Sequence, residues 1–279
     1  MPTDIALHAT DGVELAATIF EASTPAAGRA LLIAAATGVR RDFYGPLANF
    51  LASAGFDVLT FDWRGIGGSR PPSLRGFEAS MTLWGTRDLP AIIDFAVARW
   101  PNATLHALGH SFGGQALGLA PNSARLRSVV TVASQSGYFG HWKPPARYKY
   151  AALWLAVMPA LTHVAGYFPS RRMGLGEDLP RGVALEWARW CRTPDYLGDY
   201  SGHQKFCAPM LVYSFADDIY APRSAVEWLH RRYGTKELEH RHLEPRALGA
   251  KRIGHFGFFR AGNVTAPLWR QTVEWLQAR

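Results

Sequence analysis

The chain reads Gly109-His110-Ser111-Phe112-Gly113-Gly114 directly after a short apolar run, Thr104–Leu108, and directly before a helical stretch. This is the pattern G-x-S-x-G set between a strand and a helix. A serine on so tight a turn has close neighbours, so side chains at Gly109 and Gly113 would clash. A phosphate-binding loop would instead require a lysine or G-x-G-x-x-G, and neither accompanies this segment. The pattern therefore predicts that Ser111 is a nucleophile, exposed at the carboxyl end of a sheet with a helix N-terminus behind it.

Short apolar runs alternate with longer helical patterns along the rest of the chain. The runs that predict strands are Ile5–His8, Glu14–Phe20, Ala30–Ala35, Asp57–Phe61, Thr104–Leu108, Ser128–Ala133, Met210–Phe215 and Leu238–Leu243. Apolar residues at three- and four-residue spacing predict helices over Phe43–Ala54, Trp84–Arg99, Phe112–Leu119, Pro222–Tyr233 and Ala266–Ala278. This alternation predicts an α/β fold, with a mostly parallel eight-stranded sheet and helices on both faces. The turn Thr10-Asp11-Gly12 indicates that the first two strands form an antiparallel hairpin at the sheet edge.

Residues 137–205 break this alternation. The segment is rich in aromatic residues and proline and does not continue the strand–helix repeat. We interpret it as a helical cap inserted in a core that residues 1–136 and 206–279 form together.

Within this segment, Tyr150–Phe168 runs for nineteen residues without Asp, Glu, Lys or Arg. That length approaches what a membrane span requires. However, Pro159, His163 and Gly166 interrupt the run, and a span would place two halves of one sheet on opposite sides of a membrane. The stretch is therefore predicted to be a buried or interfacial cap helix, not a membrane span.

A nucleophilic serine needs a base, and the base needs an orienting carboxylate. The predicted strand Met210–Phe215 runs into Asp217 and Asp218, and His255 follows the last predicted strand. Glycines on both sides of His255 leave its loop free to bring the imidazole over Ser111. The order Ser, Asp, His along the chain is the order expected when the nucleophile lies on an elbow of this sheet.

These motifs together resemble the α/β-hydrolase superfamily, from the stretch Asp62-Trp63-Arg64-Gly65-x-Gly67-x-Ser69 to Gly254-His255. The chain is most similar to bacterial predicted serine hydrolases of the serine aminopeptidase-like or esterase-like kind, which carry a helical cap after the sixth strand. In such proteins the catalytic aspartate commonly lies four residues before a proline that starts the next helix. Counted back from Pro222, the resemblance implies Asp218 as the acid and leaves Asp217 as a structural neighbour.

The resemblance also implies an oxyanion hole of two backbone N–H groups. One is expected from Phe112, the residue after the nucleophile. The other is expected from Val39 in the loop after the third strand, where this chain has Thr37 in place of the family's frequent histidine, followed by Gly38. The alternative for Gly38 is a plain turn glycine.

Composition limits the possible partners. The chain has 279 residues, 48% hydrophobic and 19% charged, which is typical of one globular domain with a large core. Its net charge is +8, but the basic residues occur singly or in pairs and no nucleic-acid-binding motif accompanies them. We therefore expect no nucleic-acid partner and leave the oligomeric state open.

Metals, cofactors and export are not expected either. Cys191 and Cys207 lack the CxxC spacing of a zinc site and are interpreted as free thiols in a reducing cytoplasm. His106 and His110 lie four residues apart, but across a strand and a turn, which does not favour a metal pair. The start of the chain, Met1-Pro2-Thr3-Asp4, lacks the pattern of a secretory signal, so a cytoplasmic protein is expected.

The expected function is hydrolysis of a small-molecule carboxylic ester or thioester through an acyl-enzyme on Ser111. Acyl transfer or peptide hydrolysis by the same triad remains open, as does a non-catalytic binding protein on this fold. Haloalkane dehalogenases and epoxide hydrolases of this fold use an aspartate nucleophile, which Ser111 argues against. The apolar cap predicts a substrate pocket contacted by Trp142, Trp154 and Trp187.

Overall fold

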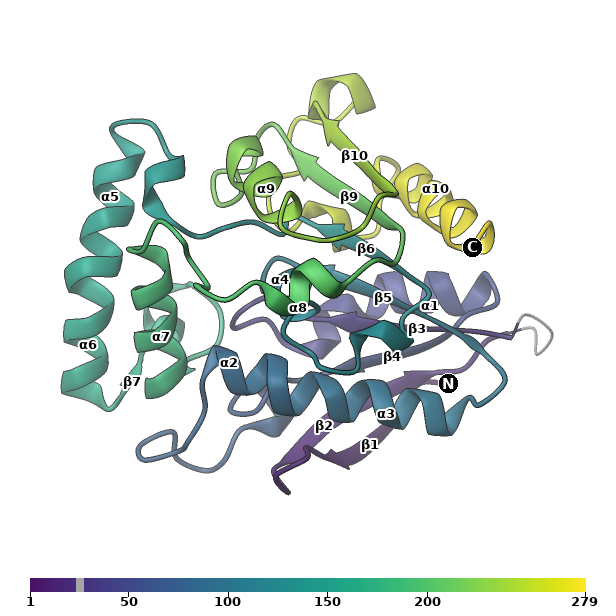
Figure 1. Ribbon diagram of the computed structural model, residues 1–279, viewed down its shortest axis with the longest axis horizontal. Helices are drawn as coiled ribbons and strands as arrows, with labels where there is room; N and C mark the ends of the chain where they lie inside the picture. The colour runs from purple at the N-terminus through teal and green to yellow at the C-terminus, as the bar shows by residue number, and fades with distance from the viewer. Residues whose placement is uncertain (24–27) are drawn as a thin grey trace.

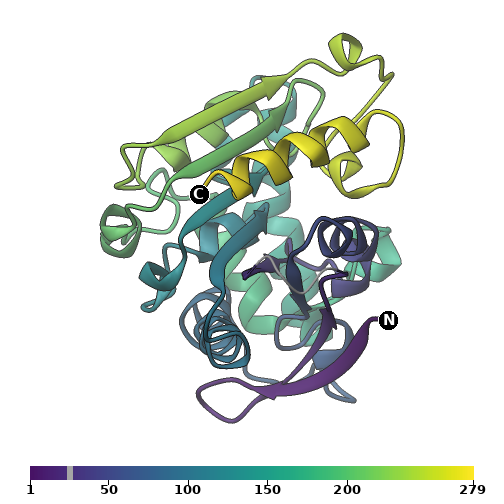
Figure 2. The same ribbon diagram turned by 90° about the vertical axis from the view of Figure 1, so that its right-hand side faces the viewer.

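An eight-stranded sheet forms the centre of the molecule (Figures 1 and 2). The computed structural model describes residues 1–23 and 28–279. The strand order is β1-β2-β4-β3-β5-β6-β9-β10, and β2 pairs in the antiparallel sense with both β1 and β4 while the other pairs are parallel. The strands are β1 (Thr3–His8), β2 (Glu14–Phe20), β3 (Arg29–Ala34), β4 (Asp57–Phe61), β5 (Thr104–His110), β6 (Ser128–Val132), β9 (Met210–Phe215) and β10 (Leu238–Leu243). The predicted mostly parallel sheet with an antiparallel edge hairpin is confirmed.

Helices cover both faces of this sheet. Helices α1 and α10 contact each other on one face, and α3, α4 and α9 lie on the other (Figures 1 and 2). Their bounds, with that of the short α2, are α1 (Gly45–Ser53), α2 (Met81–Leu83), α3 (Leu89–Arg99), α4 (Phe112–Ala116), α9 (Arg223–His230) and α10 (Thr265–Gln277). Helix α10 shows why apolar residues at three- and four-residue spacing predict a helix that packs on the sheet. It buries Trp269, Val273 and Leu276, which are spaced four and three residues apart along one side.

Two predicted helical stretches contain a π-helical turn. One spans Trp84–Asp88 before α3, and the other spans Leu153–Val157 in the inserted segment. In each, the residue after the turn donates its backbone N–H five residues back, and the next residue is a proline, Pro90 or Pro159. Proline has no N–H to give to the α-helical ladder, so the chain changes its hydrogen-bond spacing there instead of breaking the helix.

The stretch after β4 that carries the family resemblance has a structural role. The buried Arg64 forms ion pairs with Asp88 at 2.6 Å and with Asp11 at 2.7 Å. Burial raises the pKa of the Asp88 carboxyl to about 6, against the opposing effect of Arg64. Asp62 accepts backbone N–H groups from Arg41 and from the glycine turn that follows β4. These contacts fix the loop after β4 to the edge hairpin and to α3.

The segment between β6 and β9 extends from one side of the sheet. It contains α5 (Ala146–Ala152), α6 (Met158–Ala165), β7 (Tyr167–Phe168), β8 (Leu179–Pro180), α7 (Arg181–Cys191) and α8 (Ser201–Lys205). Figure 1 shows α5 and α6 as one column at the outer edge of the molecule, with α7 beside it on the inner side. Within the described ranges, no helix has the length and apolar character that crossing a membrane requires.

The turn between β5 and α4 brings three stretches of backbone into contact. Ser111 lies in this turn at φ 51° and ψ −111°, a conformation that few side-chain-bearing residues adopt. A Cβ atom added to Gly113 would collide with the carbonyl oxygen of Ala34 in β3, and one added to Gly109 would collide with the backbone of Gly114. Helix α4 can therefore begin this close to β3 and β5 only because both positions are glycine.

We expect Gly113→Ala to destabilise the fold by about 3 kcal/mol or more, because the new methyl group meets backbone that cannot move aside. Gly45→Ala is the matched control, since a Cβ at Gly45 meets nothing within 4 Å and its φ is −50°. The control should change the free energy of unfolding by less than about 1 kcal/mol. Urea unfolding of both variants measures this, and equal midpoints would contradict the steric argument.

Candidate active site

A cavity of about 270 Å³ lies where the parallel strands end and the inserted segment begins. Ser111 on the β5–α4 turn, Gln135 after β6 and His255 after β10 line it. The inserted segment contributes mainly apolar walls: Trp142, Tyr150, Leu153, Trp154, Met158, Phe168, Leu179 and Trp187. The carboxyl edge of the sheet thus brings polar groups that lie far apart in sequence to one apolar cavity.

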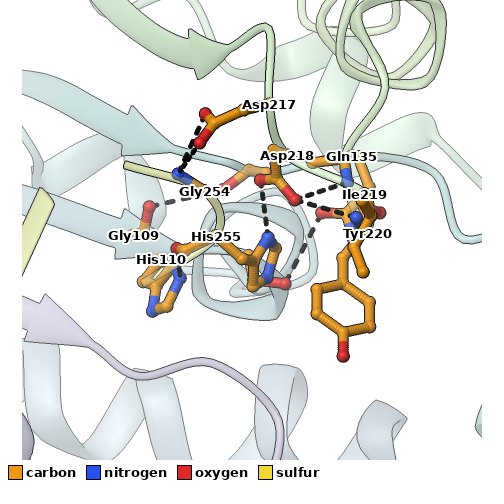
Figure 3. A network of polar contacts seen from close by, with 12 residues as sticks. Gly109, His110, Gln135, Asp217, Asp218, Ile219, Tyr220, Gly254 and His255 are labelled. Atoms are coloured by element: carbon orange, nitrogen blue, oxygen red, sulfur yellow. Dashed lines mark hydrogen bonds and ion pairs between the residues drawn. The ribbon is translucent and has the colours of Figure 1, made fainter. Parts of the chain in front are cut away.

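Asp218 and His255 are hydrogen-bonded to each other. The distance between Asp218 Oδ2 and His255 Nδ1 is 2.8 Å, and both side chains are buried. The other carboxylate oxygen, Oδ1, accepts the backbone N–H groups of Tyr220 and Ala221 at 2.8 and 3.1 Å (Figure 3). Because the carboxylate is an acceptor, His255 donates from Nδ1 and its Nε2 is the nitrogen left to take up a proton.

Asp217 points the other way and holds the histidine loop. It accepts the N–H groups of Ile253 and Gly254 at 2.9 and 3.0 Å, directly before His255 (Figure 3). The two adjacent carboxylates therefore have different partners: Asp218 bonds the imidazole and Asp217 bonds the backbone that carries it.

The Ser111 hydroxyl is directed to a residue that the sequence did not single out. It donates to Gln135 Oε1 at 3.5 Å, and among the described residues it has no hydrogen bond to His255. Gln135 is held in place from two sides: its side-chain nitrogen donates to the Tyr220 carbonyl at 3.2 Å, and its backbone carbonyl accepts from Gln115 at 2.7 Å.

The two candidate oxyanion donors differ in their surroundings. The N–H of Phe112 lies at the start of α4, and within the described ranges no backbone acceptor outside the helix is paired with it. The N–H of Val39 donates to the Ala36 carbonyl at 3.2 Å in a turn that Gly38 closes at φ 70°. Val39 would have to leave that carbonyl before it could donate to a substrate oxygen.

A buried hydrogen-bond chain connects the loops of this site. His110 Nε2 lies 2.9 Å from the His255 carbonyl oxygen, which can only accept, so Nε2 carries the proton. His110 Nδ1 then accepts the hydroxyl of Tyr44 at 2.9 Å, and the Tyr44 oxygen accepts the N–H of Ala36 at 2.9 Å. Burial, with a smaller effect of the nearby His255, lowers the pKa of His110 well below its ordinary value. The neutral His110 thus joins the turn before Ser111 to the loops after β3 and β10.

The three tryptophans predicted to contact substrate all line the cavity. Trp142 is also a structural anchor, because its indole N–H donates to the Ile219 carbonyl at 2.8 Å and Tyr150 donates to the same oxygen at 3.0 Å. Trp154 and Trp187 pack with ring centroids 4.8 Å apart. The inserted segment is therefore fastened to the loop after β9 that carries Asp218.

The histidines and cysteines outside this site have other surroundings. His106 Nδ1 shares a hydrogen bond with Ser128 Oγ at 2.8 Å, and burial lowers the pKa of His106 to about 4. The part of the chain described here contains no group of three or more His, Cys, Asp or Glu side chains able to hold a metal ion. Cys191 is buried, Cys207 is exposed, and both thiols are free.

The structure and a sequence comparison agree on the fold. Residues 31–165 match the family model described as the alpha/beta hydrolase fold. The chain has the α/β-hydrolase fold. No curated protein sequence matches this chain.

Several solved structures share the fold over nearly the whole length of both chains. A soluble variant of monoglyceride lipase from Saccharomyces cerevisiae is 15% identical with a TM-score of 0.74, over 100% of this chain and 95% of that one. An esterase from Exiguobacterium antarcticum is 15% identical with a TM-score of 0.65, over 99% and 100%. A monoacylglycerol lipase from Paleococcus ferrophilus is 18% identical with a TM-score of 0.62, over 95% and 98%.

Sequence reasoning missed two parts of the site. Gln135 follows β6, and in a parallel sheet the residues after each strand meet at one edge, so its position was a usable signal. Tyr44 carried no such signal. It lies immediately before α1, and its contact with His110 arises only when that helix packs on the sheet.

We expect Tyr44→Phe to lower the free energy of unfolding by about 1–3 kcal/mol, because the buried Ala36 N–H and His110 Nδ1 both lose their partner. Tyr148→Phe is the control: the Tyr148 side chain is exposed, and its loss should cost less than about 0.5 kcal/mol. Denaturant unfolding compares the two. A Tyr44→Phe protein as stable as the control would mean that the hydrogen bonds through Tyr44 do not hold the loops after β3 and β10.

Proposed function

We propose that this protein cleaves carboxylic esters or thioesters with Ser111 as nucleophile, His255 as base and Asp218 as orienting acid. One observation carries the proposal: His255, hydrogen-bonded to Asp218 at 2.8 Å, lines the same cavity as Ser111, a serine held at positive φ. The similar structures named as esterases and monoglyceride lipases support an ester substrate.

In the proposed reaction, the Ser111 side chain turns from Gln135 towards His255. Its oxygen attacks the acyl carbon while its proton passes to His255 Nε2, and the carbonyl electron pair moves to the oxygen. When the tetrahedral intermediate collapses, the carbon–oxygen or carbon–sulfur bond of the leaving group breaks and His255 returns the proton to it. Water, deprotonated by His255, then attacks the acyl carbon. The bond from that carbon to Ser111 Oγ breaks, His255 returns the proton to Ser111, and the acid is released.

Backbone N–H groups are proposed to stabilise the negative oxygen of both intermediates. Phe112 supplies one from the N-terminus of α4, and Val39 supplies the other after leaving the Ala36 carbonyl. Asp218 keeps the proton of His255 on Nδ1 and stabilises the imidazolium.

Residues 137–205 are proposed to act as a cap on a core of residues 1–136 and 206–279. The cavity walls that this segment supplies are aromatic and aliphatic, so an apolar acyl group is the substrate part that suits them. Trp142, Trp154 and Trp187 are the proposed contacts.

Chain-length dependence tests the proposed pocket. Because each buried methylene contributes about 0.8 kcal/mol, kcat/KM for p-nitrophenyl esters should rise from acetate towards medium chains and fall once the cavity is full. A steady decline from acetate upward would show that the aromatic walls only pack the cap.

Ser111→Ala should abolish turnover of every ester and labelling by a fluorophosphonate probe. Undiminished labelling of Ser111→Ala would remove Ser111 from the mechanism.

The adjacent carboxylates provide a matched pair of variants. Asp218→Asn should lower kcat by about 10⁴, because an amide favours the wrong tautomer of His255. Asp217→Asn keeps an oxygen that can accept from the Ile253 and Gly254 N–H groups, so kcat should fall far less. Steady-state kinetics of the two variants, each checked for folding by circular dichroism, decide the assignment. Equal losses or the opposite ranking would reject Asp218 as the acid.

A further inference from the structure

The helical column α5–α6 is apolar on its exposed side as well as on its buried side. Tyr150, Trp154, Met158 and Thr162 are buried, at intervals of four residues. The large apolar side chains exposed on the opposite side are Tyr148, Leu155, Val157, Leu161 and Val164, with exposed fractions from 38% to 88%. We call these five residues the outer face. Of the eleven exposed large hydrophobic residues in the described part of the chain, seven lie between residues 148 and 175, which is a patch rather than the usual scatter.

The outer face lies close to the opening of the cavity. Leu153, in the same helical column, lines the cavity. Leu175 and Tyr220 both line the cavity and are exposed, so they border its opening. Figure 1 shows the column of α5 and α6 at the outermost edge of the molecule. Apolar surface therefore extends from the exposed helices to the cavity that contains Ser111.

The charged residues in the sequence around the outer face are basic up to residue 176. Residues 138–176 contain the bases Lys143, Arg147, Lys149, Arg171 and Arg172, and no Asp or Glu. Arg171 pairs with Glu177 at 2.7 Å, and Arg147 donates to backbone carbonyls. Lys143, Lys149 and Arg172 are exposed, and none of the ion pairs in the described residues includes them.

We propose that the outer face docks on an anionic lipid surface. An exposed apolar helical face flanked by lysine and arginine gains free energy both from burial in the headgroup region and from attraction to anionic lipids. A second copy of this chain is the less suitable occupant. The same segment of a second copy would bring only further bases to Lys143, Lys149 and Arg172, because residues 138–176 contain no Asp or Glu.

Docking would place the cavity opening against the lipid, so that an acyl chain passes from the bilayer to Ser111 without crossing water. This step rests on the proposed function, whereas docking does not. The apolar cavity walls and the outer face then serve one substrate class, esters of lipid-soluble acyl chains.

Vesicle co-sedimentation of the full chain tests docking. The protein should pellet with vesicles of phosphatidylcholine and phosphatidylglycerol, pellet much less with phosphatidylcholine alone, and be released by added salt, which screens the charges. The double variant Leu161→Ser and Val164→Ser should bind vesicles more weakly by roughly tenfold or more, because two apolar contacts with lipid are lost. Lys143→Glu with Lys149→Glu should weaken binding similarly. Leu238→Ser is the control, since Leu238 is 39% exposed but lies on β10, away from this face.

Three results would overturn the proposal. The first is the absence of binding to both kinds of vesicle, and the second is equal binding by the serine double variant and the unchanged protein. The third is a concentration-dependent dimer, seen by light scattering, that the serine double variant abolishes, because the outer face would then be an interface between copies. Hydrolysis of p-nitrophenyl acetate without vesicles separates docking from the proposed function: the serine double variant should retain it, whereas Ser111→Ala should lose it and still bind vesicles.

Discussion

The close approach of α4 to β3 is the constraint on which the rest of this structure depends. Gly113 lies against the Ala34 carbonyl, and that contact forces the chain to turn from β5 into α4 within a single residue. Ser111 is that residue, and its positive φ is the consequence. The same turn leaves the Phe112 N–H at the start of α4 and brings His110 under the loop that carries His255. The positions of Ser111 and of the Phe112 N–H thus follow from a close backbone contact that glycine at position 113 permits.

Burial determines which polar groups in this region can change their charge. His110 is held neutral, and burial lowers the pKa of His203 and of His230 to about 4. These side chains act as fixed donors and acceptors between loops. His255 differs because it is the histidine that lines the cavity and it faces a carboxylate. One histidine thus lines the cavity beside a carboxylate, whereas His110, His203 and His230 are buried outside its lining.

The sequence predicted the elements best where local pattern alone decides them. Glu14–Phe20 and Asp57–Phe61 are strands with those same bounds, because a buried strand needs little more than its apolar run. The G-x-S-x-G turn and the order of Ser111, Asp218 and His255 along the chain were enough to predict two residues that line one cavity, Ser111 and His255, and the carboxylate that bonds His255. Contacts between distant elements could not be predicted in this way. The hydrogen bonds from Ser111 to Gln135 and from Tyr44 to His110 depend on how separate elements pack after the sheet forms.

The π-helical turn at Leu153–Val157 sets the angular register of the helices in the inserted segment. In a regular α-helix, residues spaced by four drift around the axis by about 40° at each step, so a line of four would spread over about a third of the circumference. A turn closed over five residues takes up part of that drift, and the line from Tyr150 to Thr162 stays on one side. A chain one residue shorter at this turn would rotate α6 by about 100° and exchange cavity wall for solvent-facing surface. A single extra residue therefore separates the side of the inserted segment that lines the cavity from the side exposed to solvent.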